Sequence, residues 1–203
     1  PIVCLKTGQI KELEALIRWE HPEFGLVAPQ EFINVAEETG LIIQIGEWIL
    51  QESCRQTKFW QEKFSHLRDL SISVNLSAKQ LMHPSLTSQV KNCLAKTNLD
   101  PKFLKLEVTE SMVMENAETA LQVLGEIRDL GVAFSTDDFG TGYSSLSYLH
   151  QFPFSRLKID RSFIGKMDAD LKSKAIVRTI LMLGQNLGIE IVAEGVENLS
   201  QLY

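Results

Sequence analysis

Cysteine is scarce in this 203-residue chain, and the three cysteines follow no pattern that indicates a bound metal or a disulfide framework. Cys4, Cys54 and Cys93 are odd in number and far apart, and no two of them form a CxxC pair. Disulfide-rich domains and zinc fingers both need paired or clustered cysteines, so neither class is indicated. We expect the thiols to be buried as small apolar groups in a protein of the reducing cytosol.

Positive charge and long hydrophobic runs are also lacking. The formal net charge of -6 disfavours broad adhesion to DNA or RNA, which needs clustered lysine and arginine. No uninterrupted apolar run approaches the roughly 20 residues that cross a bilayer. We therefore expect a cytoplasmic domain that binds no nucleic-acid polymer, although segments outside this sequence could anchor the full protein to a membrane.

The length of the chain suits one domain. With 203 residues and 44% apolar content the chain can bury a substantial core, but it is short for a complete eight-unit barrel. The first residue is Pro1 rather than Met, so we expect the sequence to be a piece of a longer polypeptide.

Six short apolar segments each end in a polar or acidic residue. In a strand, neighbouring residues face opposite sides, so each segment has one apolar and one polar face. The first segment, for example, sets Leu13 and Trp19 against Glu12, Glu14 and Arg18. The segments are ELEALIRW, LSISVNLS, FLKLEVTE, GVAFSTDD, RLKID and GIEIVAE. We expect their polar ends to converge on one site.

Helical periodicity separates the strands. It predicts helices over residues 31–40, 42–64 and 117–131, with Gly131 and Gly188 ending helices and Asp100-Pro101 breaking the chain before a strand. Alternating strands and helices indicate a mostly parallel sheet with helices outside. Because the inward row is polar near the strand ends, we favour an α/β TIM-like (β/α)8 barrel over an open doubly wound sheet.

Oxygen-bearing side chains are the candidate metal ligands. Inward-facing carboxylates are costly unless neutralised, and oxygen ligands are the type that Mg²⁺ or Mn²⁺ prefers. Together with Arg18, Lys158 and two divalent ions, the five acids of the set give a formal charge of +1, which suits a phosphodiester substrate. The candidate ligands are Glu14, Asn75, Glu107, Asp137, Asp138 and Glu194.

Each candidate also has a structural interpretation. Glu14 alone is more often a solvated loop anchor than a ligand. Lys158 alone is most often an ion-pair partner, but beside the acids it can orient water or stabilise negative charge. Arg18 either neutralises Glu14 or grips a phosphate.

Other side chains are assigned structural roles. Ser144 and Ser145 lack a suitably placed histidine base, so we interpret them as a helix start. The aromatic side chains of Trp48, Phe59 and Trp60 lie in an amphipathic helix and are expected in the core.

The segment EALIRW, beginning at Glu14, resembles the signature of the EAL family of cyclic di-GMP-specific phosphodiesterases. Further segments of the family pattern follow in order across nearly the whole chain: SVNLSAKQL, LEVTES, DDFGTGYSSL, LKID and AEGVE. The resemblance implies a TIM-like barrel of EAL type with an antiparallel first strand, which binds cyclic di-GMP and cleaves it to linear pGpG.

The resemblance also implies residue roles. It assigns all six candidate ligands to the metal pair, Lys158 to the attacking water, and Arg18 and Leu16 to the substrate. Our mechanistic hypothesis is that Lys158 and Glu194 together position or deprotonate that water. Glu110 is implied as the anchor of the loop DFGTGYSS, and Glu197 as a support behind the ligands. The cofactors implied are two Mg²⁺ or Mn²⁺ ions, with Ca²⁺ as an inhibitor.

The resemblance extends to partners and to departures from the family. It implies a homodimer through the loop and helix after Asp138, with sensory or GGDEF-type domains in the full protein. Residues 1–203 are then an EAL domain that lacks the start of its first strand and its last strand, which carries a Gln-Gly-Tyr motif. Two alternatives stay open: an inactive EAL domain that is a cyclic di-GMP receptor, and a structural or dimerisation module.

Overall fold

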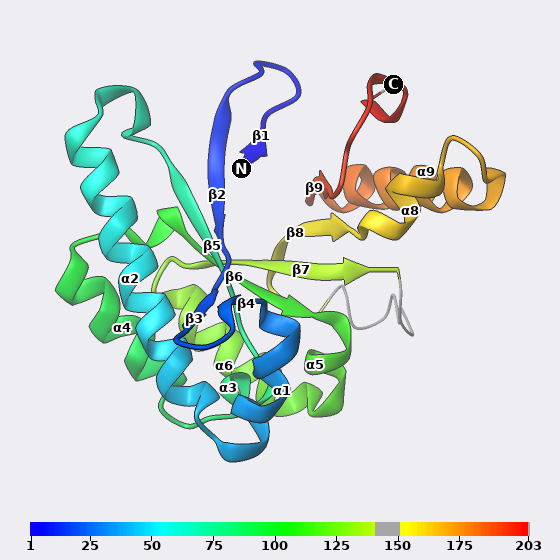
Figure 1. The fold of residues 1–203 in the computed structure, drawn as a ribbon. Helices are drawn as coiled ribbons and strands as arrows, with labels where there is room; N and C mark the ends of the chain where they lie inside the picture. Colours follow the sequence, from blue (N-terminus) through cyan, green and yellow to red (C-terminus); the bar gives the residue numbers. More distant parts are fainter. Residues whose placement is uncertain (141–150, 203) are drawn as a thin grey trace. The chain divides into compact units, whose positions relative to one another are not determined.

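The computed structural model describes residues 1–140 and 151–202 (Figure 1). The chain divides into two compact units. Unit 1 contains Pro1–Leu106 and Gly125–Ala133, and unit 2 contains Glu107–Leu124 and Phe134–Tyr203. Strand β6 (Leu104–Thr109) and helix α6 (Ala117–Asp129) each contribute residues to both units.

Unit 1 begins with four strands and continues with helices around one further strand. Apart from its part of β6, its strands are β1 (Ile2–Val3), β2 (Ile10–Ala15), β3 (Trp19–His21), β4 (Gly25–Val27) and β5 (Ser71–Asn75). Its helices are α1 (Pro29–Thr39), α2 (Ile42–Lys63), α3 (Ala78–Leu81) and α4 (Leu86–Thr97), with short 3-10 turns at Ser65–Leu67 and Pro101–Phe103.

Unit 2 alternates strands with helices. Its strands are β7 (Ala133–Phe139), whose first residue belongs to unit 1, β8 (Phe154–Ile159) and β9 (Glu190–Ala193). Its helices are α5 (Glu110–Glu115), α8 (Arg161–Lys166) and α9 (Leu171–Leu187), and a 3-10 turn covers Leu199–Leu202.

The sheet topology confirms a mostly parallel arrangement with an antiparallel first strand. A seven-stranded sheet has the order β1-β2-β5-β6-β7-β8-β9. Strand β1 pairs antiparallel with β2, while β2 pairs parallel with β5, β7 with β8, and β8 with β9. In unit 1, Figure 1 shows α2 and α4 side by side, and α2 packs on β5.

The predicted helices form close to their expected bounds. Gly188 ends α9 in the left-handed conformation with φ 68°, which only glycine adopts without steric cost. In α2 the buried residues recur every three or four positions, as a helix packing on one face requires: they are Ile42, Gly46, Leu50, Cys54 and Thr57. Among the residues that the structure describes, no helix is both long enough and apolar enough to traverse a bilayer.

Two expectations about aromatic residues are wrong. Trp48 is 60% exposed and Phe59 is 44% exposed, because neither lies on the buried face of α2. Trp19 is not on the strand that carries Glu14: β2 ends at Ala15, and Trp19 begins a hairpin in which it pairs with Val27.

Buried polar side chains lie further from the strand ends than the sequence pattern predicts. Besides Glu107 and Lys158, the buried polar residues include Glu12, Ser73 and Arg156, which precede the strand ends by several positions. Asp160 also differs from the expectation for a strand residue: it caps α8, accepting a hydrogen bond from the backbone N–H of Ser162 at 3.0 Å. Cys54 and Cys93 are buried as expected, while Cys4 is partly exposed.

Candidate active site

The buried ammonium of Lys158 is surrounded by acids in unit 2. Its Nζ atom on β8 lies 2.6 Å from Glu107 Oε2, 3.2 Å from Asp137 Oδ1 and 2.7 Å from Glu194 Oε1. The side chains of Lys158 and Glu107 are 2% and 0% exposed. Strands β6, β7 and β8 and the residue after β9 therefore each contribute one charged group to this cluster.

A β-bulge explains how two consecutive aspartates take part. Thr136 pairs with Leu157 and Phe139 pairs with Ile159, so β7 has one residue more than β8 over this interval. Asp138 has the left-handed φ of 52°. A bulge re-aims the side chains of a strand that would otherwise alternate between faces. It thereby lets neighbouring aspartates direct their carboxylates to one place.

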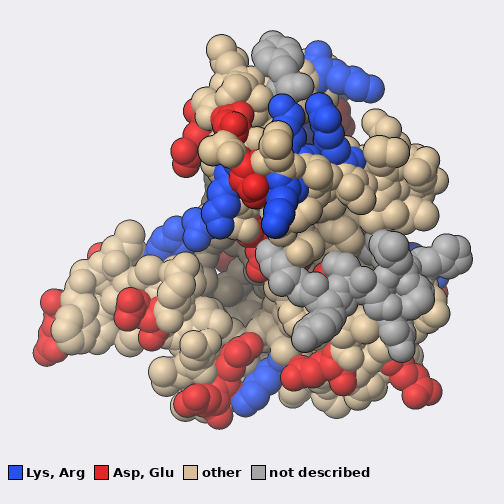
Figure 2. All heavy atoms as spheres, turned by 90° about the vertical axis from the view of Figure 1, so that its right-hand side faces the viewer, with Lys and Arg blue, Asp and Glu red and all other residues tan. Residues whose placement is uncertain are grey.

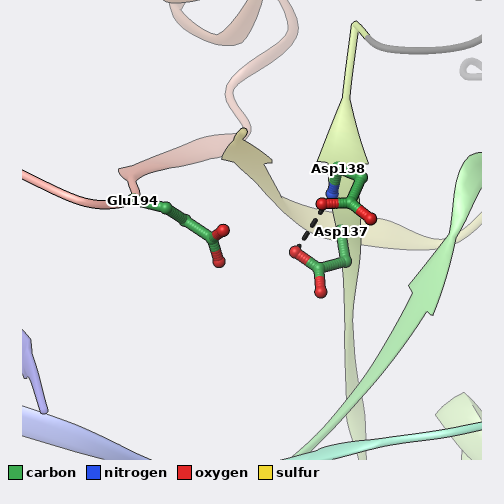
Figure 3. A group of neighbouring side chains, drawn as sticks. All are labelled: Asp137, Asp138 and Glu194. Carbon is green, nitrogen blue, oxygen red and sulfur yellow. Dashed lines mark hydrogen bonds between the residues drawn. The ribbon is translucent and has the colours of Figure 1, made fainter. Parts of the chain in front are cut away.

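Three carboxylates form a compact group at this bulge. One ligand oxygen from each of Asp137, Asp138 and Glu194 lies within 4.8 Å of the other two. Figure 3 shows Glu194 extending from the end of β9 toward the two aspartates at the end of β7. The backbone N–H of Glu194 donates to Ile159 O at 3.1 Å, and the backbone N–H of Asp138 donates to Asp137 Oδ1 at 3.0 Å.

The electrostatics of the cluster keep Lys158 charged. Burial acts to lower the pKa of Lys158, but the negative charges of Glu107 and Asp137 outweigh it and hold the pKa above its ordinary value. Burial of the carboxyl group and then the charge of Asp137 raise the pKa of Asp138, which also shares a hydrogen bond with Asp160. The four carboxylates and the one ammonium give the cluster a formal charge of -3, which favours the binding of cations.

Unit 1 holds a second, smaller set of the predicted residues. Asn75 Nδ2 donates to Glu14 Oε1 at 2.8 Å, which joins the end of β5 to β2. Arg18 donates to the carbonyl of Ile17 at 2.7 Å. Glu14, Leu16 and Arg18 all line a hollow of about 310 Å³. Leu16 is 57% exposed, so its side chain is accessible to a ligand.

The remaining predicted residues are less informative. Glu110 begins α5, but the loop that it was expected to anchor lies largely outside the described residues, as do Ser144 and Ser145. Glu197 is exposed, and its backbone N–H donates to Gln201 Oε1 at 2.7 Å. Its role behind the ligands therefore stays a prediction.

Sequence reasoning missed two polar networks, one of three residues and one of two, that lie below the candidate ligands and Lys158 on the same strand faces. In unit 1, Glu12 bonds to Ser73 and Lys105. In unit 2, Arg156 bonds to Glu190, with Nη2 2.8 Å from Oε2. The available signal was the position of these residues, two or four places before a candidate ligand or Lys158. On the face drawn in Figure 2, acidic and basic side chains are interspersed.

Comparison with known protein families shows which family the chain belongs to. The model of the EAL domain matches residues 1–203. The chain belongs to the EAL domain family. This EAL domain is 49% identical over 201 residues to the bifunctional diguanylate cyclase/cyclic di-GMP phosphodiesterase MucR of Pseudomonas aeruginosa, covering 99% of the chain and 29% of MucR. The chain spans about a quarter of the length of the curated relatives it matches.

Solved structures agree with this assignment. A PaMucR phosphodiesterase in complex with c-di-GMP matches this EAL domain with a TM-score of 0.94 at 49% identity, covering 99% of this chain and 81% of that one. The EAL enzyme Bd1971, in its cAMP- and cyclic-di-GMP-bound form, matches with a TM-score of 0.93 at 40% identity, covering 99% and 55%. The predicted fold class, the TIM-like α/β barrel of EAL type, is confirmed.

Proposed function

We propose that this EAL domain is a metal-dependent phosphodiesterase that opens one phosphodiester bond of cyclic di-GMP to give linear pGpG in bacterial second-messenger signalling. The observation that carries the proposal is the group of Asp137, Asp138 and Glu194, whose ligand oxygens lie within 4.8 Å of one another. The similarity to MucR, which is named as a cyclic di-GMP phosphodiesterase, supports the same substrate.

The donor set fits hard divalent cations. Carboxylate oxygens at this spacing suit Mg²⁺ or Mn²⁺, and the negative charge of the cluster favours two such ions. When bound, the ions would polarise the phosphodiester and lower the pKa of water. Because Ca²⁺ takes more ligands in a looser geometry, we expect it to inhibit. The proposed ligands are Glu107, Asp137, Asp138 and Glu194 and, from the sequence, Glu14 and Asn75.

Two residues of the chain act on water and on developing charge in this proposal. With its pKa raised, Lys158 is protonated near neutral pH, so it donates hydrogen bonds and stabilises negative charge rather than accepting a proton. Glu194, whose Oε1 accepts from Lys158 Nζ at 2.7 Å, is then the better candidate to accept the proton of the attacking water. Arg18 contacts a phosphate and Leu16 the body of the substrate.

Incubation with cyclic di-GMP and either Mg²⁺ or Mn²⁺, followed by chromatography, tests the proposal. We expect pGpG from the unaltered chain and a loss of at least about 100-fold in kcat for Glu194→Gln. Glu190→Gln is the matched control, because Glu190 lies four residues before Glu194, at the start of β9, and pairs with Arg156. It should retain turnover.

Each alternative function gives a different outcome. A cyclic di-GMP receptor would bind the ligand without producing pGpG, and Glu14→Ala would leave its ligand affinity intact. A structural module would show neither stabilisation by ligand in a thermal melt nor dependence on divalent ions. Either result from folded protein would contradict the proposed activity.

The proposal extends to the surroundings of the domain. We place the domain in the cytoplasm, within a larger protein that carries sensory or GGDEF-type domains. The homodimer would form through the segment after Asp138, most of which lies outside the described residues. Sedimentation of the chain with and without cyclic di-GMP measures this association.

A further inference from the structure

A buried charged network in unit 1 lies beneath the predicted ligands Glu14 and Asn75. Glu12 on β2 is 0% exposed, and its carboxylate accepts hydrogen bonds from Ser73 Oγ on β5 and Lys105 Nζ on β6. Ser73 is also 0% exposed, and the side chain of Lys105 is 16% exposed. The network therefore links three strands of unit 1 through a carboxylate that is shielded from water.

The network repeats the contact between Glu14 and Asn75 one step lower on the same strands. Glu12 is in register with Ser71 and bonds to Ser73, and Glu14 is in register with Ser73 and bonds to Asn75. Each glutamate thus reaches the residue two places beyond its register partner. Since alternate residues of a strand share a face, the lower contact and the upper contact lie on the same side of β2 and of β5.

Stability alone does not account for a buried ion pair in this position. Removing two charges from water is costly, and well-packed apolar residues in place of such a pair are often equally or more stable. Control of the register between β2 and β5 is a better explanation for the ion pair. A slip of β2 by one residue along β5 would turn Glu14 to the opposite face of the sheet, away from Asn75 and toward the side on which Ile72 and Val74 are buried.

We infer that Glu12 and Lys105 are a positioning pair: Lys105 holds the carboxylate of Glu12, whose contact with Ser73 keeps β2 against β5 in the register that brings the predicted ligands Glu14 and Asn75 together. This inference rests on the proposed function, because it assigns the pair a role only through those two ligands. Supporting residues of this kind typically change metal affinity by about 10–100-fold when they are replaced.

Mn²⁺ binding, followed by the electron paramagnetic resonance of free Mn²⁺, tests the inference without depending on turnover. We expect Glu12→Gln to weaken Mn²⁺ binding by about tenfold. In kinetics it should raise the Mn²⁺ concentration for half-activation by the same factor while leaving kcat at saturating Mn²⁺ near that of the unaltered chain. The double variant Glu12→Leu/Lys105→Met should recover stability to urea but keep the weakened affinity.

A double-mutant cycle shows whether Glu12 acts through Glu14. If it does, Glu12→Gln causes little further loss of Mn²⁺ affinity once Glu14→Gln is present, whereas independent effects would multiply. The control is Ile72→Val, on the opposite face of β5, which should lower the urea midpoint without changing Mn²⁺ affinity.

The outcomes separate this inference from the proposed function. Unchanged Mn²⁺ affinity in Glu12→Gln, or losses that multiply in the cycle, would overturn the positioning role while leaving the phosphodiesterase proposal intact. Absence of Mn²⁺ binding by the unaltered, folded chain would overturn both.

Discussion

In each unit a lysine pairs with a buried glutamate, but the two pairs lie at different depths relative to the predicted ligands. In unit 2, Lys158 lies among the acids themselves, within 3.2 Å of oxygens of Glu107, Asp137 and Glu194. In unit 1, Lys105 pairs with Glu12, two residues before Glu14, and Glu14 accepts a hydrogen bond from the neutral amide of Asn75.

The difference indicates two ways of holding a carboxylate. A buried acid such as Glu107 needs a cation beside it, because an unpaired charge in the interior is costly. Glu14 is only partly buried and lies next to exposed Asn75, whose neutral amide donates to it, so solvent shares in stabilising its charge. The ammonium in unit 2 therefore stabilises the acids directly, whereas the one in unit 1 acts one layer below them.

Replacing Lys158 tests this difference between the units and should have the largest effect on the free energy of unfolding. Lys158→Met removes the ammonium and leaves Glu107 buried without it, so we expect a loss of about 3–5 kcal/mol in the free energy of unfolding when chelator is present. Mn²⁺ should restore part of that loss, because divalent ions can neutralise the same acids. Urea unfolding with and without Mn²⁺ measures both quantities.

The matched control is the same substitution at an exposed lysine. Lys102 pairs with Asp100 on the surface, so Lys102→Met should leave the unfolding curve unchanged. Equal stability of the two variants would mean that the acids around Lys158 do not depend on its charge.

Two substitutions of Asp138 separate the effect of backbone strain at the bulge from the effect of its negative charge. We expect the changes in stability to be smaller than for Lys158→Met. Because valine is strained at φ 52°, Asp138→Val should destabilise the chain by about 1–2 kcal/mol. Asparagine tolerates the left-handed region, so Asp138→Asn should keep stability within about 0.5 kcal/mol while weakening Mn²⁺ binding. If the asparagine variant bound Mn²⁺ as tightly as the unaltered chain, Asp138 would not be a ligand.

Much of the fold follows from local patterns. Periodicity predicted α2 and α6 to within two residues at each end, because a helix that packs on one face repeats its apolar residues every three or four positions. The end of β2 at Ala15 and the hairpin of Trp19 were not predicted. Alternation continues through both, and the turn depends on pairing between Trp19 and Val27.

The candidate site was predicted in its residue types but not in its geometry. Strict alternation would place Asp137 and Asp138 on opposite faces, and only the pairing of β7 with β8 reveals the extra residue of the bulge. The Glu12 network was missed for a different reason. A lysine and a glutamate 93 positions apart in the sequence give no local signal that they form a pair.

Asn75 offers the smallest and most specific test of the difference between the units. Its contact with Glu14 is exposed, so Asn75→Ala should change the free energy of unfolding by no more than about 0.5 kcal/mol, because water replaces the lost amide. The matched variant is Ser73→Ala, two residues earlier on β5. There the buried carboxylate of Glu12 loses a donor that water cannot replace, and we expect a cost of about 1–3 kcal/mol. Equal costs in urea unfolding would show that the two contacts do not differ in burial in solution. A larger cost for Ser73→Ala, with weaker Mn²⁺ binding in both variants, would mean that the lower contact both stabilises the strands and positions the upper contact for the ions.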